Sequence, residues 1–301
     1  MYVTNLDKKI ANTKKKSVIP TLCVWSDLLG FSNPFIDSGW SPSDEQWDQI
    51  ASRLQEMQNI CAKNLNPVIE NCLVSNDAII RNLNIIHCNG LEWISMWFRD
   101  ILFYWAQVNT NEKRKNLPGL RLVMAAGERL LHNMEQVTME DYIFNYTKPD
   151  PEGPSNMSRQ YGDRVIMYNH DFMQMNTAFS KGYIIDSIGS KGGIKGNRFY
   201  IDQSVIEFLK EYARQTGIDE AEIIDTSEEN LRKVAFVVKK TGWYSLGLER
   251  EGPIHVEERN LVTNVYRLRK YYPWDEDPGE FWFDLDDMEM PAILGVVEMG
   301  E

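Results

Sequence analysis

Apolar residues recur along this chain with two spacings, which predict where its strands and helices lie. Between residues 17 and 25, β-branched and apolar residues run almost unbroken after a polar leader, as in a buried first strand. Asn76-Asp77 separates two further runs of strand type and predicts a hairpin between them. The strand-type stretches after the first are 67–75, 78–86, 119–127, 164–168 and the tail from 234 onward.

Helical spacing, with apolar residues three or four positions apart, marks other stretches. Ser43 and Gln46 have the spacing of a capping box, and the residues behind them share one apolar face: Trp47, Ile50, Leu54, Met57 and Cys61. The other predicted helices begin after Gly90 and cover 171–186 and 203–215. The helix after Gly90 is apolar on two faces, so we expect it to pack on its own sheet and on a second partner, within this chain or in another subunit.

The order of these elements predicts the fold class. Strand, helix, hairpin, helix, strand, helix and strand form an α+β layout related to the ferredoxin-like βαββαβ plan, with a β-rich elaboration at the C-terminal end. No repeat or clean linker interrupts it, so we expect a single domain over 1–301, with its core at about 18–210 and the elaboration at about 211–301. Residues 138–162 lack a period and are expected to be an insertion or mobile loop.

Composition and charge narrow the possible functions. A formal net charge of −12 argues against a protein that wraps a nucleic-acid backbone, but a metal ion can still neutralise a nucleotide substrate locally. The four cysteines form no CxxC pair, no secretory signal is readable, and the most apolar long stretch, 91–108, contains three charged residues. We therefore expect a cytoplasmic, reduced protein that does not insert into a membrane.

Two carboxylates are the first candidates for chemistry. The apolar run of the first strand reaches Asp27 and then a tight turn containing Gly30, while Asp77 lies in the predicted hairpin. A strand that ends in Asp and turns places a hard oxygen ligand beside backbone N–H groups. This arrangement suits a divalent metal and a polyphosphate, with the N–H groups of Leu28, Gly30, Phe31 and Ser32 placed to cradle the phosphates.

Together with one later segment, these motifs resemble the catalytic core of class III nucleotidyl cyclases. Residues 26–32 (SDLLGFS) are similar to the family's Asp-x-x-Gly-Phe-Ser/Thr, Asn76-Asp77 to its Gly-Asp, and residues 175–181 (MNTAFSK) to its Val-Asn-x-Ala-x-Arg helix. The resemblance implies that Asp27 and Asp77 bind two Mg²⁺ or Mn²⁺ ions. It further implies a head-to-tail homodimer in which Asn176 orients the ribose of a nucleoside triphosphate across the subunit interface.

The sequence departs from the family pattern at the transition-state cation. Ser180 stands where the family has Arg, and Lys181 is the nearest cation, with Arg81 and Arg121 as the alternatives. Lys is a weaker mimic of a forked guanidinium. We therefore assign the catalytic role to Asn176 and Lys181.

The positions that bind the nucleotide base in that family also depart from its pattern. They fall at Leu73 and Asn169, and a Leu side chain does not hydrogen-bond a purine edge. The chain is in this respect most similar to the pyrimidine cyclases of bacterial anti-phage Pycsar systems. That resemblance implies conversion of UTP or CTP to the 3′,5′-cyclic monophosphate and pyrophosphate, as a second messenger for a separate cyclic-nucleotide-binding effector.

Two other functions stay open. One is an adenylate cyclase, since the base argument depends on an ungapped alignment. The other is a catalytically silent cyclase-like domain that binds a nucleotide or a partner protein, which the absence of Arg after Asn176 favours. The Gly- and Lys-rich stretch 189–196 lacks a P-loop ending and predicts a flexible turn, and the aspartates at 284, 286 and 287 predict a solvated acidic tail.

Overall fold

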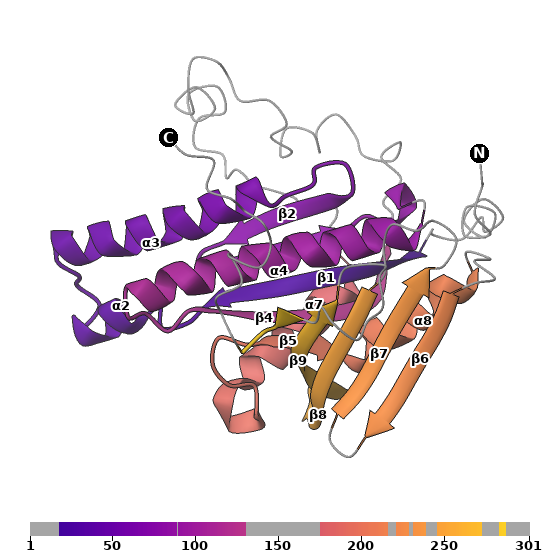
Figure 1. Ribbon diagram of the computed structural model, residues 1–301. Helices are drawn as coiled ribbons and strands as arrows, with labels where there is room; N and C mark the ends of the chain where they lie inside the picture. Colours follow the sequence, from indigo (N-terminus) through magenta and orange to yellow (C-terminus); the bar gives the residue numbers. More distant parts are fainter. Residues whose placement is uncertain are drawn as a thin grey trace.

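The core of the protein is a continuous mixed sheet. The computed structural model describes residues 18–88, 90–130, 175–215, 221–228, 231–238, 246–272 and 283–286. Within this part of the chain the sheet has ten strands in the order β2-β3-β1-β4-β5-β9-β8-β7-β6, with β10 beside β9 (Figure 1). The strands are β1 (Val18–Leu28), β2 (Glu70–Ser75), β3 (Ala78–Leu83), β4 (Leu120–Leu130), β5 (Phe199–Asp202), β6 (Ala221–Glu228), β7 (Leu231–Val238), β8 (Leu246–Glu258), β9 (Leu261–Tyr272) and β10 (Phe283–Asp284).

In the described part of the chain, two helices follow β1 and one helix follows each of β3, β4 and β5. They are α2 (Asn33–Asp37), α3 (Asp44–Lys63), α4 (Leu91–Arg114), α7 (Thr177–Ile188) and α8 (Gln203–Gln215), with short 3₁₀ turns at Ile85–His87 and Gly189–Gly192. The first half of the chain runs β1-α3-β2-β3-α4-β4, and its strands pair antiparallel in the spatial order β2-β3-β1-β4. This is the ferredoxin-like arrangement, so the predicted α+β class and βαββαβ plan are confirmed.

Several predicted elements are confirmed with shifted ends. The capping box at Ser43 is present, because Ser43 Oγ accepts the Gln46 N–H at 3.3 Å and Gln46 Oε1 accepts the Ser43 N–H at 2.9 Å. The helix predicted over 203–215 is α8. The helix predicted over 171–186 begins at Thr177, since Asn176 is its N-cap. The strand predicted over 164–168, the insertion predicted over 138–162 and Asn169 lie outside the described residues.

The first strand is longer than predicted, and the difference matters for the site. β1 continues beyond Trp25 to Leu28, because Ser26 and Asp27 are still paired with Ile79 and Ala78 of β3. Asp27 is therefore a strand residue rather than a turn residue. The short helix α2, which follows the turn after β1, was not predicted; it has Pro34 in its first turn.

The two faces of the sheet bury different helices. Figure 1 shows α3 and α4 together on one side of β1–β4. The main apolar cluster combines that side of the sheet with α3, α4 and α8, whereas α7 packs against β1 and β4 on the opposite face. Along β1 the side chains alternate accordingly: Leu22, Val24 and Leu28 enter the main cluster, and Cys23 and Trp25 face α7.

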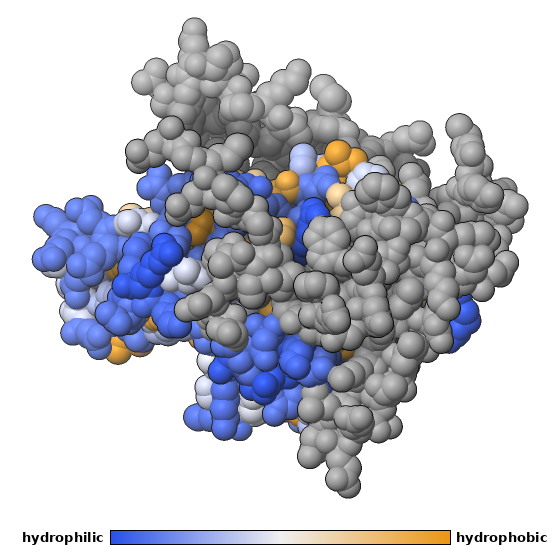
Figure 2. Space-filling model, viewed as in Figure 1, coloured by the Kyte–Doolittle hydropathy of each residue, from blue (hydrophilic) through white to orange (hydrophobic). Residues whose placement is uncertain are grey.

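The amphipathic character of α3 is confirmed except at its first turn. Ile50, Met57 and Cys61 are buried, and mostly hydrophilic residues cover the outer side of the helix (Figure 2). Trp47 was assigned to the apolar face but is 50% exposed, because it lies in the first turn and packs on Phe35 rather than on the buried residues of the core. Burial of the remaining face fixes α3 on α4.

Helix α4 is buried on both predicted faces, and its second partner is within this chain. Trp97, Phe98 and Trp105 are at most 1% exposed. Toward α3, Gln107 accepts the Asn64 side-chain N–H at 3.3 Å, and toward the sheet, Tyr271 of β9 donates to the Ser95 carbonyl at 3.4 Å. The alternative of a partner in another subunit is not needed to explain this helix.

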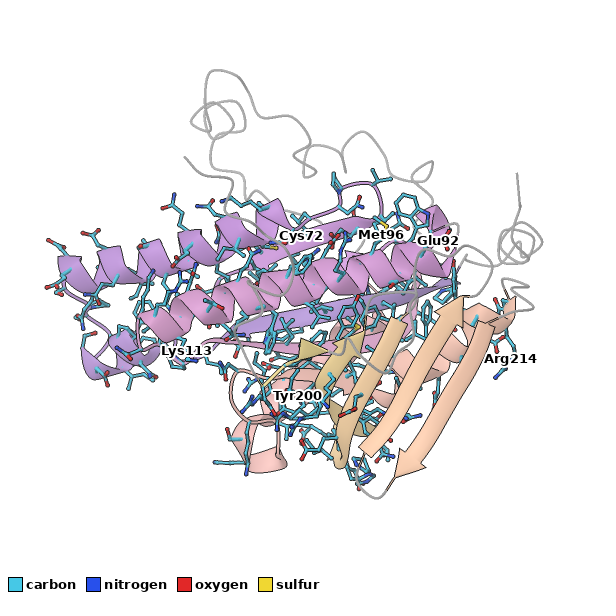
Figure 3. The ribbon with its side chains drawn as sticks, viewed as in Figure 1. Cys72, Glu92, Met96, Lys113, Tyr200 and Arg214 are labelled. Carbon is cyan, nitrogen blue, oxygen red and sulfur yellow. The ribbon has the colours of Figure 1, made fainter. Side chains whose placement is uncertain are left out.

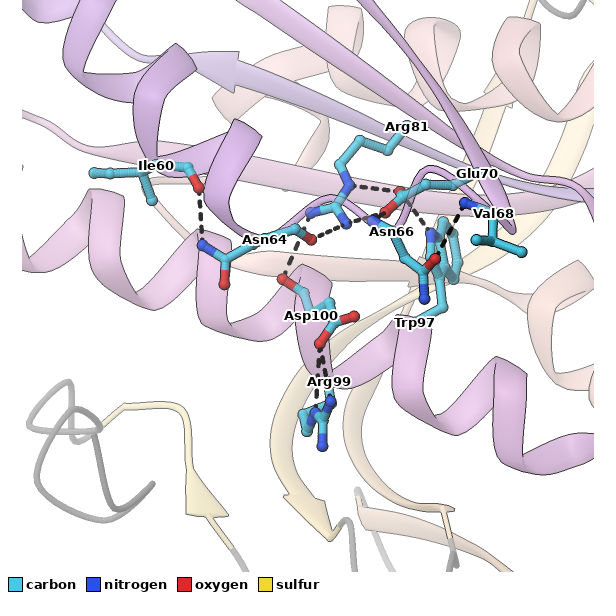
Figure 4. A network of polar contacts seen from close by, with 9 residues as sticks. All are labelled: Ile60, Asn64, Asn66, Val68, Glu70, Arg81, Trp97, Arg99 and Asp100. Atoms are coloured by element: carbon cyan, nitrogen blue, oxygen red, sulfur yellow. Dashed lines mark hydrogen bonds and ion pairs between the residues drawn. The ribbon is translucent and has the colours of Figure 1, made fainter. Parts of the chain in front are cut away.

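A buried ion pair lies beneath the hairpin (Figure 4). Glu70 accepts the Nε and Nη2 groups of Arg81 at 2.8 and 2.6 Å and the Trp97 indole N–H at 2.9 Å. The two charged side chains are 1% and 0% exposed. Arg81 also donates to the Asn64 carbonyl at 2.7 Å, so it is a structural residue that points into the core. Its sequence-based assignment as an alternative catalytic cation is wrong for this reason.

Two smaller features complete the fold. The stretch 189–196 forms a 3₁₀ turn with positive φ at Gly189, Gly193 and Gly196, in agreement with the predicted turn. Within the described residues, no helix combines the length and apolar character that crossing a bilayer requires.

Candidate active site

Asp27 and Asp77 meet at one end of the sheet. Asp27 is the penultimate residue of β1 and pairs with Ala78 of β3, and Asp77 directly precedes Ala78 in the β2–β3 turn. The carbonyl of Asp77 accepts the Leu28 N–H at 3.1 Å, so the strand end and the turn are joined by a backbone hydrogen bond. Asn76, with a φ of 54°, turns the hairpin, and its side-chain N–H donates to Asp77 Oδ1 at 3.1 Å. The backbone geometry therefore supports the prediction that these two carboxylates lie close together.

A guanidinium and a third carboxylate lie against Asp27. Arg121 is directly opposite Asp27 on β4, and its Nη2 donates to Asp27 Oδ2 at 3.2 Å. Its Nε donates to Asp186 Oδ1 on α7 at 2.5 Å, and its Nη1 to the Ile194 carbonyl at 3.4 Å. Asp186 is only 8% exposed. Arg121, an alternative cation in the sequence analysis, is thus bound to the same carboxylate that the sequence assigns to a metal.

The position of Arg121 is fixed by the loop that follows α7. Tyr200 of β5, which is labelled in Figure 3, donates through its hydroxyl to the Lys195 carbonyl at 2.9 Å and accepts the Lys195 N–H at 2.8 Å. These bonds hold the residue next to Ile194, whose carbonyl accepts from Arg121. The guanidinium is therefore oriented by a strand, a helix and a loop, and is 9% exposed.

Burial and neighbouring charges raise the pKa of Asp27 to about 7. Loss of solvent is the largest cause; the Asp186 and Asp77 carboxylates add to it, and Arg121 opposes it. Burial also raises the pKa of Asp77, with Asp186 acting in the same direction. Arg53 also acts on both aspartates but is paired with Glu112, so the three carboxylates and Arg121 leave an excess of negative charge that a divalent cation would relieve.

This pKa predicts how the metal-free protein responds to pH. Because folded Asp27 holds its proton up to about pH 7, the folded state binds more protons than the unfolded state between about pH 4 and pH 7, so the free energy of unfolding falls as pH rises through that window. Asp27 is 24% exposed, so solvent screening reduces the effect. We expect Asp27→Asn to be about 1–2 kcal/mol more stable than the wild type at about pH 8 and equal to it at about pH 4. Urea denaturation in EDTA at both pH values measures this, and an unchanged difference between them would contradict it.

The turn after β1 offers fewer backbone donors than the sequence predicts. The N–H groups of Leu28, Leu29 and Phe31 already donate to the carbonyls of Asp77, Gly119 and Leu28, at 3.1, 2.9 and 3.3 Å. Within the described residues no acceptor is found for the N–H groups of Gly30 and Ser32. A phosphate cradle here would therefore use those two amides, while the Leu28 and Phe31 side chains belong to the core.

Gly30 and Arg53 hold the turn in place. Gly30 has a φ of 66°, and a Cβ there would lie 3.1 Å from both Asn33 Nδ2 and Pro118 Cγ, so the position requires glycine. Arg53 of α3 donates to the Leu29 carbonyl at 2.8 Å while paired with Glu112 of α4. The two helices therefore fix the segment that joins Asp27 to α2.

Asn176 lies far from Asp27 within one chain, whereas Lys181 precedes Gly182, where a Cβ would lie 3.2 Å from Trp25 Cβ of β1. Asn176 bridges to Arg129 near the end of β4, whereas Asp27 pairs with Arg121 near its start. Eight residues of strand separate the two positions, or about 27 Å. The Asn176 side chain is buried, where it accepts the Phe179 N–H at 3.0 Å as the N-cap and donates to Asn82 Oδ1 at 2.7 Å. Lys181 Nζ donates to the Ala126 carbonyl at 3.0 Å, and the Ser180 hydroxyl to the Asn176 carbonyl at 3.2 Å.

Leu73 belongs to an apolar group on the α7 side of the sheet. It lies on β2 opposite Ile80 and packs, together with Trp25 and Phe179, against a small buried cluster. The rings of Trp25 and Phe179 have centroids 5.7 Å apart. Asn169, the other predicted base-reading residue, lies outside the described residues.

The residues at Asp27 and Asp77 fit a divalent cation. They supply hard carboxylate oxygens in a place where burial and neighbouring carboxylates already penalise the unneutralised charge. Within the described chain, no group of three or more His, Cys, Asp or Glu side chains is arranged to hold a metal. Mg²⁺ commonly binds one or two carboxylates and takes its other ligands from substrate phosphates and water. The donor set matches a metal that arrives with a polyphosphate.

Sequence reasoning missed Asp186 and the ion pair of Arg121 with Asp27. Both depend on strand register and on which face of α7 meets the sheet, neither of which can be read from the spacing of residues. A buried acidic residue in the apolar helix α7 was the one available signal, since an unpaired carboxylate is costly to bury.

Comparisons with known proteins give structural neighbours only. No protein-family model and no curated protein matches the chain. The solved structures similar to it include the adenylyl cyclase CyaB from P. aeruginosa, with 11% identity, a TM-score of 0.41, and coverage of 84% of this chain and 95% of that one. They also include the guanylyl cyclase Cya2, with 10% identity, a TM-score of 0.40, and coverage of 88% and 98%. A third is the guanylate cyclase domain of RhGC from Catenaria anguillulae, solved with GTP, with 8% identity, a TM-score of 0.38, and coverage of 83% and 95%. The solved structures to which this chain is similar are thus adenylyl and guanylyl cyclases.

Proposed function

We propose that this protein is a nucleotidyl cyclase that converts a nucleoside triphosphate into its 3′,5′-cyclic monophosphate and pyrophosphate. The observation that carries the proposal is the convergence of Asp27 and Asp77 at one end of the sheet, where burial and the charge of Asp186 raise the pKa of both carboxyl groups. Such a site gains most from a ligand that brings a divalent cation. A triphosphate complexed with Mg²⁺ or Mn²⁺ is a ligand of this kind.

In the reaction, the ribose 3′ oxygen forms a bond to the α-phosphorus, the bond from that phosphorus to the bridging oxygen breaks as pyrophosphate leaves, and the proton of the 3′ hydroxyl passes to solvent water. Bound metal would lower the pKa of that hydroxyl and neutralise the triphosphate. Asp27 and Asp77 would hold it. The Gly30 and Ser32 amides would donate to phosphate oxygens, and Arg121, oriented by Asp186, would keep the unused Asp27 oxygen in place.

The active form in this proposal is a head-to-tail homodimer. Asn176 lies at the opposite end of β4 from Asp27, so one chain does not place these two residues in one site, and the Lys181 amine is bound to the Ala126 carbonyl, five residues along β4 from Arg121. A partner turned end for end would bring its Asn176 to the ribose and its Lys181 to the phosphates. Each would have to exchange an internal hydrogen bond for one to the substrate, because both side chains are engaged within the chain.

For the substrate base we propose a pyrimidine, with UTP or CTP as the triphosphate. Leu73 supports this choice, since it packs with Trp25 and Phe179 and supplies apolar contact instead of a hydrogen bond to a purine edge. By the same resemblance to pyrimidine cyclases, the product would be a messenger in anti-phage defence, read by a separate effector.

A silent domain is the second candidate, and the ion pair between Arg121 and Asp27 favours it. A guanidinium 3.2 Å from the carboxylate neutralises part of the charge that a metal would use. The presence of Ser180 at the position where the resemblance leads one to expect an arginine also favours a silent domain. Such a protein would bind a nucleotide or a partner protein without chemistry.

The test is incubation of the purified protein with Mn²⁺ and ATP, GTP, CTP or UTP, separately, with products identified by mass. We expect a cyclic pyrimidine monophosphate and pyrophosphate, and no product after EDTA is added. Asp27→Ala protein, run in parallel, controls for a co-purified enzyme. Cyclic AMP would overturn the base assignment but keep the chemistry. No cyclic product, together with metal-dependent heat stabilisation by a triphosphate, would establish the silent domain instead.

A further inference from the structure

Three arginines outside the Asp27 site converge on one carboxylate. Arg198, which precedes β5, donates through Nη1 to Asp286 Oδ1 at 2.6 Å. Arg267 of β9 donates through Nη2 to the same oxygen, and Arg269 donates through Nη2 to Asp286 Oδ2 at 3.0 Å. Asp286 was predicted to lie in a solvated acidic tail; instead its side chain is 30% exposed and is the centre of this arginine triad.

Among the described residues, the triad carries more positive charge and more donors than its carboxylates satisfy. Glu251 is the second acidic partner in this part of the chain, at 3.3 Å from Arg267 and 3.4 Å from Arg269, so three guanidiniums share two described carboxylates. Within the described residues, Arg267 Nε is buried without a hydrogen-bond partner. A buried donor left unpaired is costly, and a ligand with more acceptor oxygens would recover that cost.

The segment that carries Asp286 is held in place by its neighbours. Asp284 of β10 pairs with Lys270 of β9, and the Leu285 N–H donates to the Arg269 carbonyl at 2.8 Å. The Leu285 side chain is 2% exposed. The strand pair and the buried Leu285 side chain therefore hold Asp286 against the three arginines. Its carboxylate occupies a site whose walls come from β5 and β9.

The triad lies on the next two strands beyond the candidate active site, at the start of β5 and on β9. The Arg198 carbonyl accepts the N–H of Leu122 at 3.0 Å, and Leu122 follows Arg121, the residue bound to Asp27. Strands β1, β4, β5 and β9 are neighbours in the sheet, about 4.8 Å apart each. Asp27, Arg121 and the triad thus follow one another across this end of the sheet.

We propose that the triad of Arg198, Arg267 and Arg269 is a binding site for the phosphate groups of a small polyphosphate, and that Asp286 is an internal anion that competes with it. A phosphate offers more acceptor oxygens and more charge than a carboxylate, and guanidiniums bind it through two parallel hydrogen bonds. A duplex or single-stranded nucleic acid is a poor occupant, because the chain carries a net charge of −12. The proposal does not require that the protein cyclise a nucleotide.

The test is calorimetric titration of wild-type and Asp286→Asn protein with inorganic tripolyphosphate and, separately, with UTP, both in EDTA. If Asp286 fills the triad most of the time, its removal raises the apparent affinity by about tenfold. Arg198→Gln or Arg269→Gln, added to Asp286→Asn, should abolish the gain. Arg259→Gln is the matched control and should leave it, because Arg259 is exposed and, among the described residues, pairs with its neighbour Glu258 alone.

The two titrants separate the sources of phosphate. Tighter binding of UTP than of tripolyphosphate to Asp286→Asn assigns a nucleotide, and the reverse assigns free polyphosphate; both support the site. An affinity for tripolyphosphate that Asp286→Asn does not raise overturns the proposal, as does a gain that survives both arginine substitutions. The metal-free titration is independent of cyclase activity, so the absence of a cyclic product would leave this result unaffected.

Discussion

Replacing Glu70 with Gln should lower the free energy of unfolding by about 3–5 kcal/mol. Glu70 is the carboxylate partner of Arg81, and both side chains are almost completely buried. The substitution leaves a guanidinium charge in the core, where desolvation is costly unless the charge is paired. It also weakens the acceptor of the Trp97 indole N–H, which joins α4 to β2. Urea denaturation monitored by tryptophan fluorescence measures the change.

Two further variants separate the buried charge from a general effect of losing an ion pair. Glu56→Gln breaks the exposed pair with Lys115 and should cost no more than about 1 kcal/mol. Glu70→Leu combined with Arg81→Met removes both buried charges and should recover most of the lost stability. A Glu70→Gln protein as stable as Glu56→Gln would show that water or another group compensates Arg81.

The fold could be predicted well where local pattern determines it. The Ser43 capping box, the Asn76-Asp77 turn and the two-faced α4 each follow from spacings of a few residues, and each is found. The end of β1 was placed too early, because Ser26 and Asp27 are polar and do not extend the apolar run. What keeps them in the strand is pairing with β3 and β4, which no local pattern contains.

The candidate site could be predicted only in part, for the same reason. Asp27 and Asp77 were found because one directly precedes a recognisable turn and the other lies within one. Arg121 was no more than one of several cations in the sequence, since its place opposite Asp27 depends on the register of β1 against β4. Asp286 was interpreted as a solvated acid because its three arginine partners lie 17 to 88 positions away in sequence, as from Arg269 to Arg198.

Asn176 has a structural role in addition to the catalytic one that the sequence predicts. The sequence assigns it to the ribose, and the structure uses it as the N-cap of α7 and as a partner of Asn82. A cap of this kind is worth about 1 kcal/mol, a modest amount beside a charged substrate's binding energy. The substitution chosen to test its role must therefore keep the cap.

Asp27→Ala and Asn176→Ser proteins should each lose nearly all cyclase activity, by about 10³-fold or more for the metal ligand, and should recover it when mixed. Ser keeps an N-cap acceptor for the Phe179 N–H but does not reach a ribose. If the two residues act in one site across a head-to-tail dimer, each mixed dimer has one intact site and one site with both substitutions. Random exchange of subunits then gives about one quarter of the wild-type activity.

The recovery follows from the distance between the two residues along β4. Asp27 lies opposite Arg121 and Asn176 opposite Arg129, too far apart along β4 for one chain to place both in one site. Recovery on mixing therefore requires that each site takes these two residues from different chains. Subunits are exchanged by incubation before the triphosphate and Mn²⁺ are added, and cyclic product is quantified by mass. Mixing Asp27→Ala with Asp77→Ala is the matched control: both defects fall on the same half of the site, so no intact site forms. Recovery in that control, or none in the test mixture with both proteins folded and dimeric, would exclude the composite site.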